Sequence, residues 1–171
     1  MAATKLTGAG EVLATDFKAV KYVGKTKGGK AVQITMPKAF CRSNPDWTFA
    51  EKDDVVPEIT FEGAYDDEKL AQGDRTEPWE VEYADGTVAG NEEIVLGVGK
   101  FYVDDEYIGL TRGGGSFKVE REYREINADG DPGLVEGRVE QNTGRPTMTF
   151  KALQWLTKTS KLYAGMKTVT D

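Results

Sequence analysis

The chain has 171 residues, of which 39% are hydrophobic and 30% charged, a composition that can bury the core of one ordinary domain. It has no histidine and one cysteine, Cys41, which excludes Ser–His and Cys–His nucleophile pairs and any internal disulfide. The net charge of −7 disfavours tight nucleic-acid binding, since that affinity comes mainly from Lys and Arg at phosphates.

The charge is unevenly distributed along the chain. Residues 1–50 hold eight Lys/Arg against three Asp/Glu, residues 51–86 hold three against thirteen, and residues 87–171 hold eleven against thirteen. The middle segment alone therefore carries a net charge of −10. No apolar stretch approaches the length of a membrane span, and a single cysteine favours a reducing site of synthesis. We expect no catalytic residue, no cofactor and no metal site.

The first half of the chain is predicted to form strands, with two short helices. Alternating apolar and polar residues predict half-buried strands, and Gly28–Gly29 predicts a hairpin turn between the first two. Pro37 fits the first position of one helix, whereas acidic residues followed by Gly73 fit the two ends of another. The strands are expected at residues 18–26, 30–37, 55–65 and 78–86, and the helices at residues 36–43 and 66–73.

In the second half, predicted strands are again separated by clusters of turn-forming residues. The three glycines within 111–116 and the segment 127–133 are predicted to be tight turns. Strands are expected at residues 99–111, 116–126, 133–141 and 146–156, and a third helix candidate at 156–165. The predicted fold class is therefore mainly β, a two-sheet sandwich or barrel with one or two short helices.

Two motifs that could bind ligands fail on their spacing. Gly24–Lys25–Thr26 lacks the first glycine of a phosphate-binding loop, because Ala19 stands in its place and a hairpin follows. Asp129 and Asp131 lack the further ligands and the closing glutamate of a calcium loop. The sequence therefore predicts neither a phosphate-binding loop nor a calcium site.

Large aromatic residues provide the remaining candidate surface. Residues 44–55 look like a long excursion between strands, and Trp47 and Phe49 within it could anchor a partner subunit or simply pack on the core. Trp79 and Trp155 could join Trp47 in a ligand platform, although tryptophans beside strands are more often core or subunit contacts. Both interpretations of these aromatic residues stay open.

Two long stretches resemble the tail-tube (major tail) proteins of double-stranded DNA bacteriophages. They are GKFYVDDEYIGLTRGGGSFKVEREYREINADGDPGLVEGRVEQ (99–141) and GKTKGGKAVQITMPKAFCRSNPDWTFAEKDDVVPEITFEGAYDD (24–67). The resemblance implies a two-sheet sandwich-like barrel with a flanking helix, forming hexameric rings that stack into a hollow tube. It further implies a structural virion protein in the phage tail, assembled in the bacterial cytoplasm with other tail proteins. DNA would pass through the tube without specific binding and with no role for a membrane, a cofactor or catalysis.

The resemblance also directs attention to particular side chains. The candidates for contacts between subunits are Trp47, Phe49, Arg112, Arg121 and Arg124. The candidates for charge on the wall of the lumen are Asp66, Asp67 and Glu68, since an acidic wall would repel phosphate. Alternating charges along 116–126 could pair across neighbouring subunits in a ring.

The order of the two stretches is reversed relative to this family. Residues 1–86 resemble the C-terminal half and residues 94–171 the N-terminal half of a single domain spanning 1–171, with an exposed join near 84–93. This order indicates a circular permutant, in which Thr4 and Val169 should lie close together. A permuted chain could form tubes, stop at rings or remain monomeric, and the contractile or non-contractile nature of the tail stays open. Two other functions also stay open, a monomeric β-sandwich binding or virion decoration module and a carboxylate-based hydrolase using residues 51–86.

Overall fold

The computed structural model describes residues 4–49, 51, 54–83, 95–130, 132–153 and 161–170. Among these residues, ten antiparallel strands, one short α-helix and one 3-10 turn account for the regular structure. The strands are β1 (Thr4–Gly8), β2 (Phe17–Thr26), β3 (Ala31–Cys41), β4 (Glu58–Gly63), β5 (Glu80–Tyr83), β6 (Val95–Val103), β7 (Glu106–Tyr107), β8 (Thr111–Glu125), β9 (Val139–Ala152) and β10 (Met166–Thr170). The helix is α1 (Asp67–Ala71), and the 3-10 turn η1 is Ala14–Asp16. The prediction of a mainly β fold with two sheets and little helix is confirmed.

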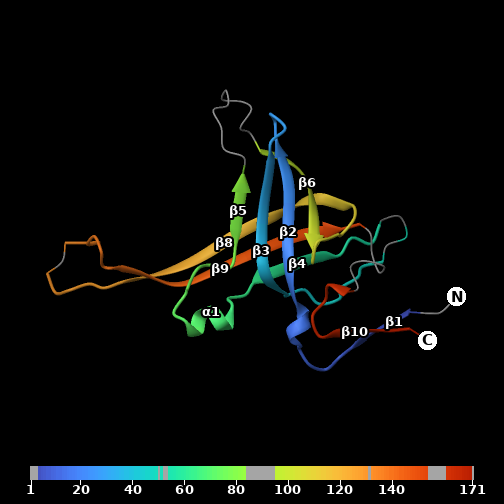
Figure 1. Ribbon diagram of the computed structural model, residues 1–171, viewed down its shortest axis with the longest axis horizontal. Helices are drawn as coiled ribbons and strands as arrows, with labels where there is room; N and C mark the ends of the chain where they lie inside the picture. Colours follow the sequence, from blue (N-terminus) through green and yellow to red (C-terminus); the bar gives the residue numbers. More distant parts are fainter. Residues whose placement is uncertain are drawn as a thin grey trace.

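The larger sheet supplies both layers of the domain. In the described part of the chain its strand order is β7-β6-β2-β3-β4-β9-β8, with β5 alongside β3. Strand β3 carries the sheet from one layer to the other, because residues 32–35 pair with β5 and residues 39–41 with β4. In Figure 1 the strands β2, β3, β5 and β6 run across the direction of β4, β8 and β9. The sheet therefore folds over on itself as a sandwich.

The core lies between these two layers. Every second residue of β9 from Gly144 to Ala152 is buried, as expected for a strand with one face on the core. Phe150 on β9 stacks on Phe101 of β6 at 4.8 Å between ring centroids, although these strands are not neighbours in the sheet. Phe150 also stacks on Phe61 of β4 at 6.2 Å. The aromatic residues thus join the two layers through their facing surfaces.

The helix predicted at residues 36–43 is wrong, because residues 36–41 belong to β3 and the two that follow have no regular structure. The pairing of β2 with β3 shifts between Val20↔Met36 and Lys18↔Ala39, so β3 has one extra residue there. Pro37 lies inside this bulge, where a residue without a backbone N–H removes little from the hydrogen-bond ladder. Pairing with strands on both sides thus overrides the local helix signal.

The tight turn predicted at residues 111–116 is also wrong. These residues open the long strand β8, and the register with β9 shifts between Thr111↔Ala152 and Gly115↔Phe150. Gly113 and Gly114 have φ values of 80° and 77°, a backbone region that favours glycine. These two glycines thus form a bulge in a continuous strand and not a turn between two strands.

The two other helix predictions had different outcomes. The predicted helix at 66–73 is confirmed as α1, which begins after Asp66 and is followed by Gly73 at φ 82°. Of the candidate at 156–165, residues 156–160 lie outside the described residues and residues 161–165 form turns. The strand expected at 133–141 begins only at Val139. Of the strand expected at 146–156, residues 146–152 form the second half of β9, and residues 154–156 lie outside the described residues.

Strands β8 and β9 form a long hairpin that leaves the body of the domain. Their pairing continues from Gly115↔Phe150 to Glu125↔Val139, and the predicted turn within 127–133 lies in the connecting segment. In Figure 1 this hairpin extends well away from the other strands. It is the most prominent projection of the described chain in that view.

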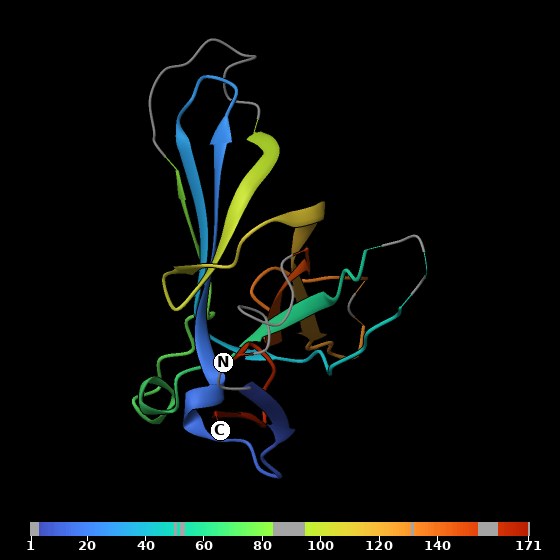
Figure 2. The same cartoon turned by 90° about the vertical axis from the view of Figure 1, so that its right-hand side faces the viewer.

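The two end segments of the described chain pair with each other. Strands β1 and β10 form a separate two-stranded sheet, in which Thr4 lies opposite Thr170 and Lys5 opposite Val169. Figures 1 and 2 both show the N and C labels beside this pair. The expected proximity of Thr4 and Val169 is confirmed, whereas the join near 84–93 lies outside the described residues.

Candidate functional site

Trp47 and Phe49, predicted as neighbouring anchors for a partner subunit, have different environments. Trp47 is half-buried and packs against the core cluster, beside the buried residue Tyr163. Burial raises the pKa of the Tyr163 hydroxyl, and the adjacent indole acts in the opposite direction. Phe49 is 70% exposed. Of the two residues, Phe49 has the surface position that a contact with another chain requires.

Arg121 is held by a compact group of side chains at the base of the β8–β9 hairpin. Its guanidinium donates two hydrogen bonds of 2.8 Å to the carboxylate of Glu77 and lies over the ring of Trp79. The Trp79 indole N–H donates to Glu77 at 2.6 Å, and the amide of Gln141 donates to the same carboxylate. These donors, Arg121 foremost, lower the pKa of Glu77 to about 2. The group therefore fixes the segment before β5 onto the hairpin.

The other two arginine candidates are also paired within the chain. Arg112, at the start of β8, lies 3.2 Å from Asp54. Arg124 lies 3.7 Å from Glu140, its cross-strand partner in the hairpin. Both pairs are largely exposed, so each contributes little to stability. The charges expected to pair between subunits thus have partners inside one subunit as well.

The three acids proposed for the lumen wall mark the start of α1. Asp66 is its N-cap, accepting a 3.1 Å hydrogen bond from the Glu68 backbone N–H. The ammonium group of Lys38 donates to Asp66 at 2.6 Å and is the main cause of the lowered pKa of that carboxyl. Asp67 and Glu68 are exposed in the first turn, where negative charge is favourable. Asp66 therefore has a local structural role, while Asp67 and Glu68 face solvent.

Two long edges of the larger sheet are open in the described chain, and the short strand β5, which pairs only with β3, leaves a third. Strand β8 has 15 residues and pairs only with β9, and β7 at the other edge covers only Tyr102 and Val103 of β6. The outer edges of β8 and of the remainder of β6 therefore present backbone groups with no partner strand among the described residues. A long unpaired edge is a template for pairing with another chain.

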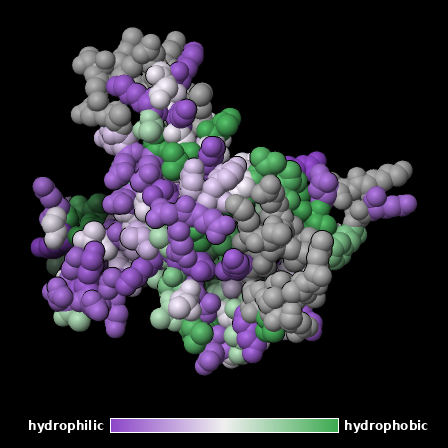
Figure 3. Space-filling view, turned by 45° about the vertical axis from the view of Figure 1, so that its right-hand side comes forward, coloured by the Kyte–Doolittle hydropathy of each residue, from purple (hydrophilic) through white to green (hydrophobic). Residues whose placement is uncertain are grey.

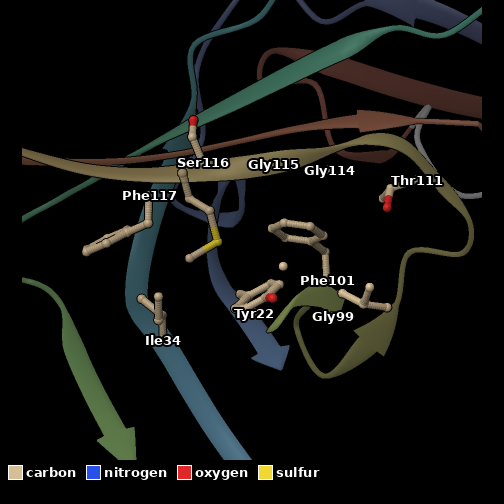
Figure 4. A pocket seen from close by; sticks show the side chains of 12 residues that line it. Tyr22, Ile34, Gly99, Phe101, Thr111, Gly114, Gly115, Ser116 and Phe117 are labelled. Atoms are coloured by element: carbon tan, nitrogen blue, oxygen red, sulfur yellow. The ribbon is translucent and has the colours of Figure 1, made fainter. Parts of the chain in front are cut away.

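An apolar hollow lies between these two open strands. It has a volume of about 380 Å³, and Tyr22, Phe101 and Phe117 are among its lining residues. Figure 4 shows the Phe101 ring between β6 and the glycine segment of β8, with Tyr22 next to it. A Cβ on Gly115 would lie 2.5 Å from the Phe101 ring and 2.6 Å from the Thr149 carbonyl oxygen. Glycine is therefore required where β8 crosses this ring.

A second hollow lies on the body near the base of the hairpin, and we call it the arginine-rimmed groove. Its volume is about 510 Å³, and its floor is aromatic and aliphatic. Its lining residues include Val12, Phe17, Phe40, Arg42, Glu62 and Arg145. Phe17 contacts Phe40 with 5.4 Å between ring centroids, and Arg42 lies over Phe40. Both arginines pair with the same carboxylate, Glu62, at 2.6 Å and 3.3 Å. Two cations thus share one anion at the rim.

The surface as a whole is hydrophilic with scattered apolar side chains. Figure 3 shows hydrophilic residues over much of one face and separate small apolar areas. Val98 and Leu134 are the most exposed of the large aliphatic residues described, at 84% and 67%. The buried thiol of Cys41 has a pKa raised to about 11, mainly by desolvation, and is therefore unreactive.

The described residues contain no cluster of three or more His, Cys, Asp or Glu side chains that could hold a metal ion. None of the helices in the described part is long and apolar enough to span a membrane. Comparisons with protein-family models, with curated proteins and with solved structures found no match.

Neither Glu77 nor the arginine-rimmed groove was predicted from the sequence. Glu77 was one acid among thirteen in residues 51–86, and its partners Arg121 and Gln141 are 44 and 64 positions away in the chain. The groove combines residues of the N-terminal segment with residues of β3, β4 and β9. The one available signal for Glu77 was its place two residues before Trp79, whose indole N–H needs a buried partner.

Proposed function

We propose that this chain is a self-assembling structural subunit of the tail-tube type, whose copies form hexameric rings that stack into a hollow conduit for DNA. The observation that carries the proposal is the pair of open sheet edges, one along β8 and one along β6. Because the two edges differ, pairing one with the other joins subunits head to tail. Repetition of a head-to-tail contact closes a ring when the rotation per subunit fits.

The shape of the domain supports such an assembly. Small solitary sheets usually protect their edges with short strands, prolines or a covering loop. Here β8 is the longest described strand and continues into a projecting hairpin. The charged side chains and the bulge of β8 would also protect an edge in a monomer, but the length of this edge suits a ring subunit, which uses it in every copy.

The charge of the chain supports a conduit more than a nucleic-acid clamp. The chain carries −7 overall and −10 within residues 51–86. Asp67 and Glu68 face solvent at the start of α1, where they add to the local negative potential. We propose that acids of this segment line the lumen, because a negative wall repels phosphate and lets DNA pass.

The alternative of a monomeric binding or decoration module relied on exposed tryptophans as a ligand surface. Trp47 and Trp79 are half-buried and pack against the core cluster, and Trp155 lies outside the described residues. The described tryptophans therefore do not form an open platform. This weakens the specific basis of that alternative and leaves self-assembly as the function that the geometry favours.

The test is the mass and shape of the purified protein as its concentration is raised. We expect sedimentation analysis to show species much larger than 18.8 kDa and electron microscopy to show rings or tubes with a central channel. If the protein stays at the monomer mass at every concentration, the proposal is wrong. A variant with Asp67→Asn and Glu68→Gln should assemble equally well but retain DNA more strongly at low salt.

A further inference from the structure

We infer that the tip of the β8–β9 hairpin of one copy seats in the arginine-rimmed groove of another copy. The hairpin tip is defined as residues 125–140, which join the two paired strands. The inference rests on the proposed self-assembly in that the occupant is a second copy of this chain. It adds a specific contact that the open sheet edges alone do not define.

The hairpin tip has the chemistry that the groove lacks. Residues 125–140 hold five acids against one base, a net charge of −4. Leu134 is 67% exposed within this acidic segment, and Ile126 near it is also exposed. The tip therefore carries an exposed aliphatic side chain within an acidic stretch of the sequence.

The groove offers the complementary arrangement. Its floor includes Val12 and Phe17, which are 58% and 41% exposed and so have apolar surface available for burial. At its rim Arg42 and Arg145 both pair with the carboxylate of Glu62, and Arg145 also lies opposite Glu120 of β8, so the rim presents two guanidinium groups. A leucine on the floor with a carboxylate against the rim would satisfy both features.

The tip cannot reach the groove of its own chain. Arg145 lies at the base of the hairpin, and the ladder from Glu120↔Arg145 to Glu125↔Val139 carries the tip away from it. Six residues of extended strand between Val139 and Arg145 span about 20 Å. The backbone hydrogen bond from Ile126 N–H to the Arg138 carbonyl continues the pairing toward the tip. The contact must therefore form between copies, and because its two sides differ it is head to tail.

Cross-linking between two variants, each with one added cysteine, tests the contact directly. One variant carries Leu134→Cys in the tip and the other carries Val12→Cys in the groove, while Cys41 is buried and remains unreactive. After mild oxidation of the mixture we expect a covalent heterodimer on a non-reducing gel. The matched control replaces Val12→Cys by Val81→Cys, an exposed position on β5 outside the groove, which should give at most a small fraction of that product.

The outcomes separate this inference from the proposed function. Rings without the tip–groove cross-link would overturn the inference and leave self-assembly standing. The cross-link without rings or tubes would support the contact and overturn the ring proposal. If neither is found, both are overturned, and if both are found, both are supported.

A charge exchange gives an independent readout that a misfolded variant cannot imitate. Arg145→Glu should greatly reduce assembly, and adding Glu136→Arg in the tip should restore most of it. Lys151→Glu, on the same strand but outside the groove, should have little effect. Failure of the double variant to recover, with circular dichroism showing an intact β fold, would contradict the inference.

Discussion

The carboxylate of Glu77 joins segments that are far apart in the sequence. It accepts hydrogen bonds from Arg121, Trp79 and Gln141, and its side chain is only 15% exposed. Arg121 could be selected from the sequence for its place in a charged strand. The partner that holds it could not be predicted, because no local pattern links position 77 to position 121. Similarly, the composition around Trp47 could not show that its indole packs on the core while Phe49 faces solvent.

We predict that Glu77 makes the fold sensitive to acid. Its pKa in the folded protein is about 2, below the ordinary value of 4.5, so its contribution to the free energy of unfolding is full above about pH 4.5 and is lost as the pH falls toward 2. Glu77→Gln should lower the free energy of unfolding by about 1–2 kcal/mol at pH 7, since hydrogen bonds to charged groups are the stronger ones. The difference between variant and wild type should shrink below pH 4.

Urea unfolding at a series of pH values measures this effect. Glu136→Gln, the same chemical change on the exposed hairpin, serves as the matched control and should leave the unfolding free energy nearly unchanged. A Glu77→Gln variant with the same stability as the wild type at pH 7 would show that the group does not hold the hairpin.

We predict that Gly115 tolerates no side chain. The added methyl group of Gly115→Ala would meet the ring of Phe101 at 2.5 Å and the Thr149 carbonyl oxygen at 2.6 Å. Such overpacking should lower the free energy of unfolding by about 1–3 kcal/mol. Gly97→Ala is the matched control, because no atom lies within 4 Å of the new Cβ. Equal denaturation midpoints for the two variants would contradict the expected clash.

At the scale of elements, the sequence predicted most strands but not their irregularities. Period-2 alternation depends on which residues face the core, and it identified β2, β4 and the buried part of β9. Bulges depend on the register of a distant partner strand. Pro37 therefore appeared to begin a helix, and Gly113–Gly114 appeared to form a turn, whereas pairing with β2 and β9 makes both segments parts of strands.

We predict that the hairpin tip is not needed for folding. Replacing residues 126–138 by Asn-Gly would join Glu125 directly to its partner Val139 through a two-residue turn. The residues removed are mostly exposed, so the free energy of unfolding should change by less than about 1 kcal/mol. Circular dichroism and urea unfolding check this expectation. The same variant should remain folded but fail to assemble. If the variant unfolds instead, the tip belongs to the folding unit.

At the scale of the whole molecule, the sequence predicted the class of fold but not how one sheet supplies two layers. That arrangement depends on β3 pairing with β5 along residues 32–35 and with β4 along residues 39–41. The stacking of Phe101 on Phe150 follows from it. No local signal in β3 distinguishes a strand that passes between layers from one that stays in a single layer. The proximity of residues 4 and 170 could be anticipated only from the reversed order of the two family-like stretches.

The last prediction tests that reversed order. A permutant in which residue 171 is joined to residue 1 by a short Gly-Ser linker, with new ends opened within residues 84–93, should fold as the present chain does. The linker has little distance to cover, because Thr4 lies opposite Thr170 in the β1–β10 pair. The entropic cost of closing a short loop is small when its ends are already held together. The expected result is an unchanged circular dichroism spectrum and a free energy of unfolding within about 1 kcal/mol of the parent.

A matched permutant with new ends within residues 147–149 would interrupt β9 where Met148 and Phe150 are buried, and it should not fold. If instead the permutant opened within 84–93 is the one that unfolds, that segment is part of the folding core and the interpretation of residues 84–93 as a join is wrong. If it folds and also forms rings, the choice of chain ends is independent of assembly. The new connection alters the β1–β10 pair but leaves the open edge of β8 and the hairpin tip unchanged. In that case the contacts between copies must come from such unchanged surfaces.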